Sequence, residues 1–564
     1  MILPLVVFLV NVGLPTLVAA SFIQREDPAE RMGLATAATL LGLYAIGFGA
    51  YSAGVDRVVW WLWPLVASAT ACLRARAVLS VLRAPKAREI MAGWLAFAAW
   101  SIGLLLFVRC YGGGGWAVDW WEHLQRARIF SQGLSPDTPL VHGMYSMGAR
   151  PPMGNAIMAV LLWLGGDNLT RYVVLNTLLS SLIFFPAILL ARGWTRGTRS
   201  LLPFTTAAVL MLNPMTAQNL SYAWTRHLCA FWILLGSHLL LRGIVRGDSI
   251  VNRTLGWLAL GAGLLTHYST GPYIAVWLIV YAIIIGRRLP VGAFLVESSR
   301  HALWCGLLLA TWFLWSYTSL GWSGTVASNT TMTGAGAGWW ANLTTFALNV
   351  RDTLVPHVFR TTTTGIPAQP SAWGAMRDLF FNLYQVNLPM MLGTAGLLCL
   401  GLRAVKAKQR PRWGWVGAIT SLVLIGVGVH TQRDDVGLGH ICLQPLVLIG
   451  LTKIAAVLAQ EEKGGVLIAW KAGAMVDCAV GIVLTFALQT MVFGSAADYS
   501  LAVRINQYAL SYLRDSLPGS SIPNALPWGL LMTGGAMWWT VQKWRAKKIA
   551  GAHHLDRIQP APPS

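Results

Sequence analysis

Residues 119–128, DWWEHLQRAR, place several acid–base and phosphate-binding side chains close together. If this stretch is helical, four ionisable residues at i, i+3, i+4 and i+7 share one face: Asp119, Glu122, His123 and Arg126. Three apolar residues fall on another face: Trp120, Leu124 and Ala127. The pattern predicts a short helix with an ionisable face and an apolar back.

The helix lies in residues 109–155, which carry more ionisable groups than the apolar stretches on either side. A carboxylate beside a membrane can act as general base on an acceptor hydroxyl. Asp119 stands among Trp116, Trp120 and Trp121, and partly dry surroundings are where titratable groups are tuned. The alternative is that Asp119 is an exposed acid on a loop helix. The neighbouring tryptophans do not exclude it, because tryptophans are also common at membrane interfaces without a catalytic role. We interpret the segment as an active-site loop with Asp119 as base.

Glu122 and His123 are further catalytic candidates, and they could join Asp119 as ligands of a divalent cation. Carboxylates and water suit Mg²⁺ or Mn²⁺. Glu122 could equally pair with Arg126 at i, i+4. The sequence leaves both readings open.

Three arginines lie on the expected outer face, against the positive-inside trend: Arg126, Arg128 and Arg150. Guanidinium groups bind phosphate through two parallel hydrogen bonds. The alternative is an ion pair with Glu122 or Asp137. We predict that at least one of the three contacts a phosphate group.

Two further places could contribute to the same site. His267 stands where glycine and proline interrupt an apolar pair of segments, and a polar residue at membrane depth suggests function. A histidine bonded to a backbone carbonyl is the alternative there. Arg433 and His440 lie in the charged loop 430–440 and could hold a phosphate, unless the two aspartates of that loop neutralise Arg433.

Composition decides the class of protein. The chain has 564 residues, of which 55% are hydrophobic and 11% charged, whereas about 25% charged residues is usual in soluble domains. Apolar runs of roughly 18 to 22 residues recur, each long enough to cross a hydrocarbon core of ~30 Å. We predict an all-α polytopic membrane protein with about 15 transmembrane helices and long outer loops.

The net charge of +21 would suggest nucleic acid in a soluble protein. Here most basic residues lie in short loops between spans, so they set the topology and no nucleic-acid partner is expected. The seven cysteines form no C-x-x-C pair and nearly all lie in apolar runs, which indicates packing rather than disulfides or metal binding.

Four divisions of the chain are expected: extra transmembrane helices in 1–88, a catalytic core in 89–460, further transmembrane helices in 461–548 and a disordered cytoplasmic tail in 549–564. The outer loops are expected at 109–170, 320–385, 430–440 and 495–526. Residues 153–165 are apolar but too short to cross, so they are expected to lie along the interface or dip into the membrane.

Several features together resemble the GT-C class of integral-membrane glycosyltransferases, which includes the protein mannosyltransferases and aminoarabinose transferases. The features run in chain order: the acidic outer loop Val118–His123, Asn213-Pro214, the aromatic residues Tyr222 and Trp224, Thr266-His267-Tyr268, and Gly439–Pro445 before a proline-bearing span. They cover roughly residues 89 to 460.

The resemblance implies an enzyme that moves a sugar from a polyprenyl-phosphate donor to a glycan, lipid or protein acceptor on the outer face, usually with inversion. It implies Asp119 as base and Arg126, Arg150, Arg433 or His440 as phosphate contacts, with no soluble cofactor. The setting would be a bacterial inner membrane with a periplasmic site.

The chain departs from the GT-C class in two respects, and two other functions remain as alternatives. The three spans before residue 89 are extra relative to that class, and a large soluble C-terminal domain is missing. An O-antigen polymerase or ligase also has outer-loop arginines and histidines. A transporter of a lipid-linked glycan would place its charges near mid-membrane and show inverted repeats.

Overall fold

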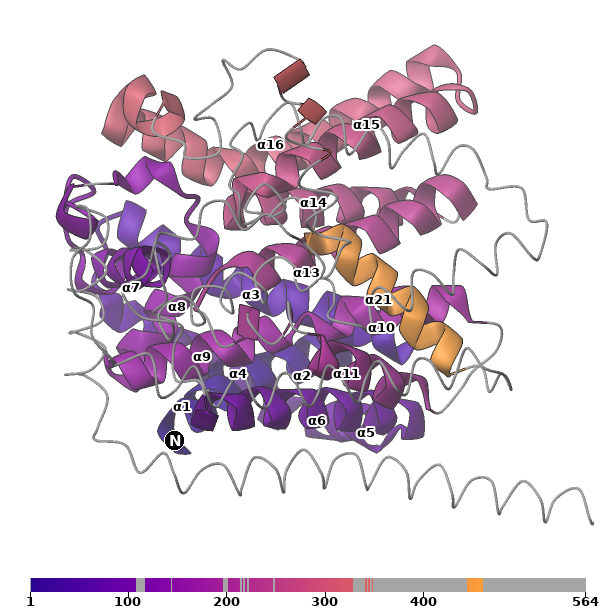
Figure 1. The fold of residues 1–564 in the computed structure, drawn as a ribbon, viewed down its shortest axis with the longest axis horizontal. Coiled ribbons are helices and arrows are strands. Elements are labelled where there is room, and N and C mark those ends of the chain that lie inside the picture. Colours follow the sequence, from indigo (N-terminus) through magenta and orange to yellow (C-terminus); the bar gives the residue numbers. More distant parts are fainter. Residues whose placement is uncertain are drawn as a thin grey trace, which may run out of the picture.

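The computed structural model describes residues 2–107, 117–143, 145–195, 201–213, 223–246, 249–327 and 444–459, with a few single positions at 216–220 and 340–347. In this part of the chain the regular elements are helices (Figure 1). The first eight α-helices are α1 (Ile2–Phe8), α2 (Leu14–Phe22), α3 (Pro28–Ser52), α4 (Leu62–Leu73), α5 (Ala75–Arg83), α6 (Pro85–Phe107), α7 (Ala117–Gln132) and α8 (Met153–Gly165). The remaining described ones are α9 (Leu169–Ser181), α10 (Phe184–Trp194), α11 (Leu202–Leu212), α13 (Arg226–Leu240), α14 (Ile250–Thr266), α15 (Gly271–Gly286), α16 (Val291–Trp322) and α21 (Gln444–Leu458).

Short 3-10 and π-helical segments join or extend these helices. They are η1 (Leu9–Gly13), η2 (Arg57–Trp61), η4 (Val141–Gly143), η5 (Met147–Ala149), η6 (Leu241–Arg246), η7 (Tyr268–Thr270) and η8 (Ser323–Ala327). η7 separates α14 from α15, at the glycine- and proline-containing break expected from the sequence.

Six helical stretches within the described residues are long and apolar enough to cross a membrane. They are Ile2–Phe22, Pro28–Ser52, Leu169–Trp194, Arg226–Ile244, Tyr268–Gly286 and Val291–Val326. The all-α, multi-pass class is therefore confirmed. The total of about 15 spans stays a prediction, since most of residues 328–443 and all of residues 460–564 lie outside the described part of the structure.

The basic stretch after α4 differs from the expected loop. The chain turns by 83° between α4 and α5, and α5 is a helix of nine residues. Val78 and Val81 lie one turn apart and are buried, while Arg76 and Arg83 are exposed. This division of apolar and charged residues between two faces stabilises a helix where charge alone indicated a loop.

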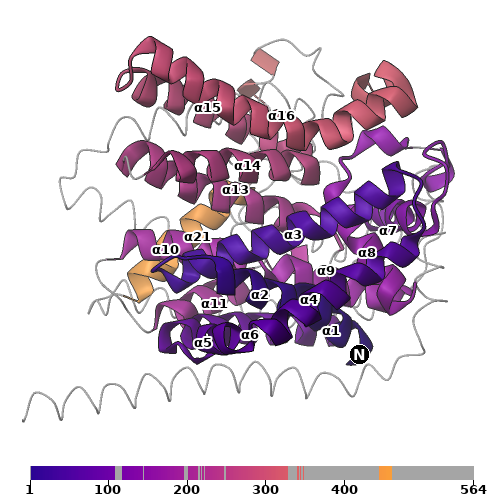
Figure 2. The same ribbon diagram turned by 180° about the vertical axis from the view of Figure 1, so that it is seen from behind.

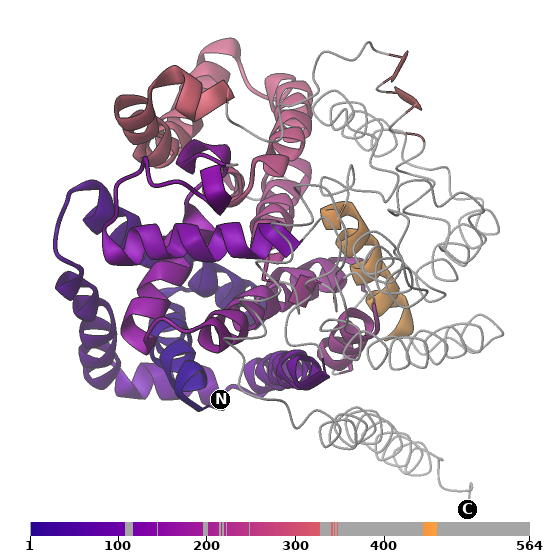
Figure 3. The same ribbon diagram turned by 60° about the vertical axis from the view of Figure 1, so that its left-hand side comes forward.

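The N-terminal helices belong to the same hydrophobic core as the rest of the described chain. α3 packs against α7, α8 and α10, and Figure 2 shows it running toward the end of the bundle where α7 and α8 lie. The Phe48 ring of α3 contacts Phe130 of α7 and Trp315 of α16, with ring centroids 5.9 and 5.4 Å apart. α21 lies against α10 and α11 (orange in Figure 3).

α8 is enclosed by protein and packs closely against α3. Eleven of its thirteen residues are buried, which favours a helix enclosed by protein over one that lies on the membrane surface. A Cβ atom added to Gly47 of α3 would stand 2.8 Å from Val160 Cγ2 and 2.9 Å from the Ala156 carbonyl oxygen. Only glycine permits this contact between the two backbones.

We expect Gly47→Ala to lower the free energy of unfolding by about 1–3 kcal/mol, because the added methyl group meets backbone as well as a side chain. Gly49→Ala is the matched control, since a Cβ atom there meets nothing within 4 Å. Thermal unfolding of the purified protein in detergent compares the two. Equal unfolding temperatures would contradict the close approach of α3 and α8.

Candidate active site

α7 carries the residues expected to do chemistry, and its position is fixed at its C-terminal end. The helix stops at Gly133, whose φ of +68° allows the Leu134 N–H to bond back to the Ile129 carbonyl. The Tyr51 hydroxyl of α3 donates to the Leu134 carbonyl at 2.9 Å, and Arg57 Nε donates to the Phe130 carbonyl at 3.3 Å. These contacts with N-terminal residues set the direction of α7.

Both faces of α7 are buried, the ionisable face as well as the apolar one. Trp120, Leu124 and Ala127 are fully covered, as expected for the apolar side. Glu122 and Arg126 are covered equally, with exposed fractions of 0% and 1%. Burying charges without partners is costly, so their contacts must compensate.

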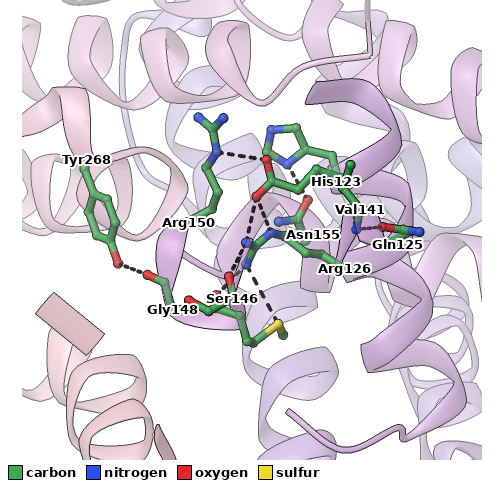
Figure 4. A network of polar contacts seen from close by, with 11 residues as sticks. His123, Gln125, Arg126, Val141, Ser146, Gly148, Arg150, Asn155 and Tyr268 are labelled. Atoms are coloured by element: carbon green, nitrogen blue, oxygen red, sulfur yellow. Dashed lines mark hydrogen bonds and ion pairs between the residues drawn. The ribbon is translucent and has the colours of Figure 1, made fainter. Parts of the chain in front are cut away.

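Glu122 is the centre of a buried ionic network (Figure 4). Its Oε1 atom accepts from Arg126 Nη2 at 2.7 Å and from Arg126 Nε at 3.0 Å, a two-point contact within one helical turn. Its Oε2 atom faces Arg150 Nε at 3.3 Å. Two guanidinium groups thus hold one carboxylate.

Arg126 also anchors the turn that follows α7. Its Nη2 atom donates to the Ser146 carbonyl at 2.6 Å, and Nη1 donates to the Met147 carbonyl. The next carbonyl, that of Gly148, accepts from the Tyr268 hydroxyl at 3.3 Å. η5 is therefore held between α7 and the break that separates α14 from α15.

His123 connects α7 with α8. Its Nδ1 atom lies 3.0 Å from Asn155 Oδ1. Burial lowers the pKa of His123 to about 3, although the charge of Glu122 opposes that change. The ring is therefore neutral at physiological pH, and Nδ1 carries the proton that it donates to the amide oxygen.

The ionic network keeps Glu122 charged. Burial alone raises the pKa of this carboxyl, but the positive charges of Arg150 and Arg126 lower it more, and the net pKa lies below its ordinary value. A carboxylate in this state is a poor proton acceptor at neutral pH. Glu122 thus suits the positioning of arginines better than the acid–base role considered for it.

The other expected residues fall in different places. Asp119 lies in the first turn of α7, but its side chain is outside the described part of the structure, as are Arg433 and His440. Arg128 lies off the network and forms a two-point contact with Asp167, at 2.8 and 3.1 Å. That partner differs from both of the acids considered from the sequence.

His267 supports the break between α14 and α15. Its Nδ1 atom accepts from the Ser269 N–H at 3.2 Å and lies 2.9 Å from Ser269 Oγ. The side chain therefore caps η7. The backbone partner seen here is an N–H group, whereas the alternative considered from the sequence was a backbone carbonyl.

The Glu122 carboxylate, considered as a ligand of a divalent cation, has both of its oxygens facing arginine side chains. Within the described residues, no group of three or more histidine, cysteine, aspartate or glutamate side chains could hold a metal ion. A site that includes the Asp119 carboxylate stays a prediction.

Two partners in this network escaped the sequence reasoning. Asn155 orients His123, and Tyr268 fixes the Gly148 carbonyl. The sequence offered one signal for Asn155, its place just after Pro151-Pro152 where a helix can begin. The backbone acceptors of Arg126 have no signal in the sequence, because any residue supplies a carbonyl.

A comparison with solved structures finds a distant similarity to two crystal structures of ArnT. They are ArnT from Cupriavidus metallidurans bound to undecaprenyl phosphate (16% identity, 79% of this chain and 75% of that chain covered, TM-score 0.43) and the same protein in the apo state (15% identity, 79% and 76% covered, TM-score 0.44). With identities and scores this low, the similarity assigns no activity to the chain.

No protein-family model matches the sequence, and no curated protein matches it either.

We expect Glu122→Gln to lower the free energy of unfolding by roughly 3 kcal/mol, because it removes the charge of a fully buried carboxylate that ion-pairs with the fully buried Arg126. The matched control is Asp167→Asn, which breaks the partly exposed pair with Arg128 and should cost less than about 1 kcal/mol. Thermal unfolding in detergent measures both. A smaller loss for Glu122→Gln than for Asp167→Asn would contradict the network.

Stability should fall as the pH drops from 6.5 to about 5, with a contribution from His123. In this window the unfolded chain protonates His123 while the folded chain does not, so the unfolded state binds more protons. Glu122, whose folded pKa is depressed, adds its loss only at lower pH, below its unfolded value. Unfolding temperatures across the window should decline less steeply in His123→Gln. An identical decline would show that His123 is not buried in its neutral form.

Proposed function

We propose that this chain is a membrane glycosyltransferase that transfers a sugar from a polyprenyl-phosphate donor to an acceptor on the periplasmic face of a bacterial inner membrane. The observation that carries the proposal is the buried Glu122–Arg126–Arg150 network, one turn along α7 from Asp119 and within a bundle of membrane-length helices. A lipid-linked phosphate needs both of these surroundings, cationic groups and apolar helices.

Arg150 is the best candidate for the phosphate contact. It approaches Glu122 through Nε, so its terminal nitrogens point away from that carboxylate (Figure 4). Its side chain keeps 12% exposure, whereas Arg126 keeps 1% and uses Nε and both terminal nitrogens on Glu122, Ser146 and Met147. Arg126 therefore positions the network, and Arg150 can neutralise the charge of a departing phosphate.

The proposed reaction is an inverting displacement. Asp119 removes the proton of the acceptor hydroxyl, whose oxygen attacks the anomeric carbon from the side opposite the phosphate. The bond between that carbon and the phosphate oxygen breaks, and the polyprenyl phosphate leaves with both bonding electrons. The Arg150 guanidinium offsets the negative charge that develops on the leaving oxygen.

Reconstituted proteoliposomes test the proposal. The donors are undecaprenyl-phosphate sugars labelled on the sugar, and the acceptor is an extract of host envelope lipids and glycans. We expect Asp119→Asn to reduce turnover about a hundredfold or more while donor binding is retained, because the substitution keeps the size but removes the base. Asp137→Asn is the matched control, an exposed acid of the same outer segment that should keep wild-type turnover.

Two other outcomes carry information. If Asp119→Asn turns over like the wild type, Asp119 is not the base. If the wild type consumes no polyprenyl-phosphate sugar, the glycosyltransferase proposal fails and a polymerase, ligase or glycan transporter takes its place. A parallel arm with EDTA tests the divalent cation: a loss of turnover that Mg²⁺ or Mn²⁺ restores would assign one.

A further inference from the structure

A basic face runs along α5 and into the start of α6. Its exposed residues are, in chain order, Arg76, Leu79, Ser80, Arg83, Lys86 and Arg88. The four from α5 are spaced i, i+3, i+4 and i+7, so they lie on one side of that helix, opposite the buried Val78 and Val81. Figures 1 and 2 both show α5 at the end of the bundle remote from α7. The basic face therefore lies away from the candidate active site.

The cations of this face have no partner among the described residues. They are Arg76, Arg83, Lys86 and Arg88, and none forms an ion pair or a side-chain hydrogen bond with another described residue. No acidic residue occurs between Asp56 and Glu89. By contrast, Arg74 at the same corner donates to the Ser21 carbonyl at 3.1 Å and lies over the Phe22 ring. The fold thus uses Arg74 and leaves the other four cations exposed.

Two of the four cations stand where a helix disfavours them. Arg76 is the second residue of α5, and Lys86 is the second residue of α6. The first turn of a helix is the positive end of its dipole, which favours negative charge. Arg83 is placed favourably, in the last turn of α5. Arg76 and Lys86 would therefore gain from an anion supplied from outside the described chain.

The residues around the corner indicate which anion this is. α4 exposes apolar side chains along its length, among them Leu62, Leu65 and Val66, and Leu73 at its end is 88% exposed. Beyond the 83° turn the exposed side chains become mostly basic. An exposed apolar face that gives way to a basic one matches the passage from the hydrocarbon core to the lipid headgroups. Leu79, exposed among the cations, adds apolar contact with such a surface.

We propose that the basic face of α5 and α6 binds anionic phospholipids, with its four cations against the lipid phosphates and Leu79 among the acyl chains. The positive-inside pattern of the sequence puts this face at the cytoplasmic leaflet. The partner is a lipid of the bilayer and not a substrate of the candidate active site. Binding of this kind depends on the net charge of the lipid, and salt weakens it.

Lipid titration of the detergent-solubilised full chain tests the proposal, followed through the rise in unfolding temperature. Phosphatidylglycerol is the anionic lipid, and phosphatidylcholine with the same acyl chains is the zwitterionic one. The α5 variant combines Arg76→Gln with Arg83→Gln. The matched control combines Arg287→Gln with Arg300→Gln, which removes the same charge from two other exposed arginines, after α15 and in α16.

We expect phosphatidylglycerol to stabilise the wild type more than phosphatidylcholine does, and the difference to shrink as NaCl is raised from about 50 mM to about 500 mM. The α5 variant should bind phosphatidylglycerol about twentyfold more weakly, at roughly fivefold for each cation near the surface. The control should bind it like the wild type. Without lipid, the α5 variant should unfold at the wild-type temperature, because neither arginine has a partner among the described residues.

Three results would overturn the proposal. Equal stabilisation by the two lipids would show that the charge of the headgroup is not recognised. An equal loss in the two double variants would show that net charge, and not the face on α5, recruits the lipid. A lower unfolding temperature of the α5 variant without lipid would show that its arginines stabilise the fold itself. None of these results bears on sugar transfer, which the proteoliposome assay measures separately.

Discussion

A single carboxylate held by two guanidinium groups organises the end of the described bundle where α7 and α8 lie. Glu122 is fully buried, and it remains charged only because Arg126 and Arg150 lie against it. Arg126 in turn is 1% exposed and has that carboxylate as its ion-pair partner. The three side chains must therefore be placed together, and their placement requires α7 and the segment before α8 to keep a fixed relation.

The network extends from side chains into backbone. Arg126 donates hydrogen bonds to the Ser146 and Met147 carbonyls, and the Tyr268 hydroxyl donates to the carbonyl of Gly148. Trp312 of α16 donates to the Tyr268 hydroxyl at 3.4 Å. A displacement of α16 would consequently be transmitted to α7 through η5. Helices that are far apart in the sequence thus share one set of hydrogen bonds at the candidate site.

The sequence predicted the helix in residues 119–128, the interrupted apolar pair around His267 and the multi-pass helical class, because periodicity and apolar length are local properties. It could not decide whether Glu122 binds a metal or Arg126, since both need the same residue type at the same spacing. It missed the helix α5, because the basic residues there were interpreted as a loop although Val78 and Val81 form a short apolar stripe. It also missed Asn155, whose importance comes from the His123 ring beside it.

The right-angled turn after α4 bears on how the protein sits in its bilayer. If α4 crosses the membrane, a helix turned by 83° runs almost parallel to the plane of the lipids. With Val78 and Val81 packed inward and Arg76 and Arg83 outward, α5 would rest among the headgroups of the cytoplasmic leaflet. Such a helix would fix the depth at which the bundle sits in the bilayer.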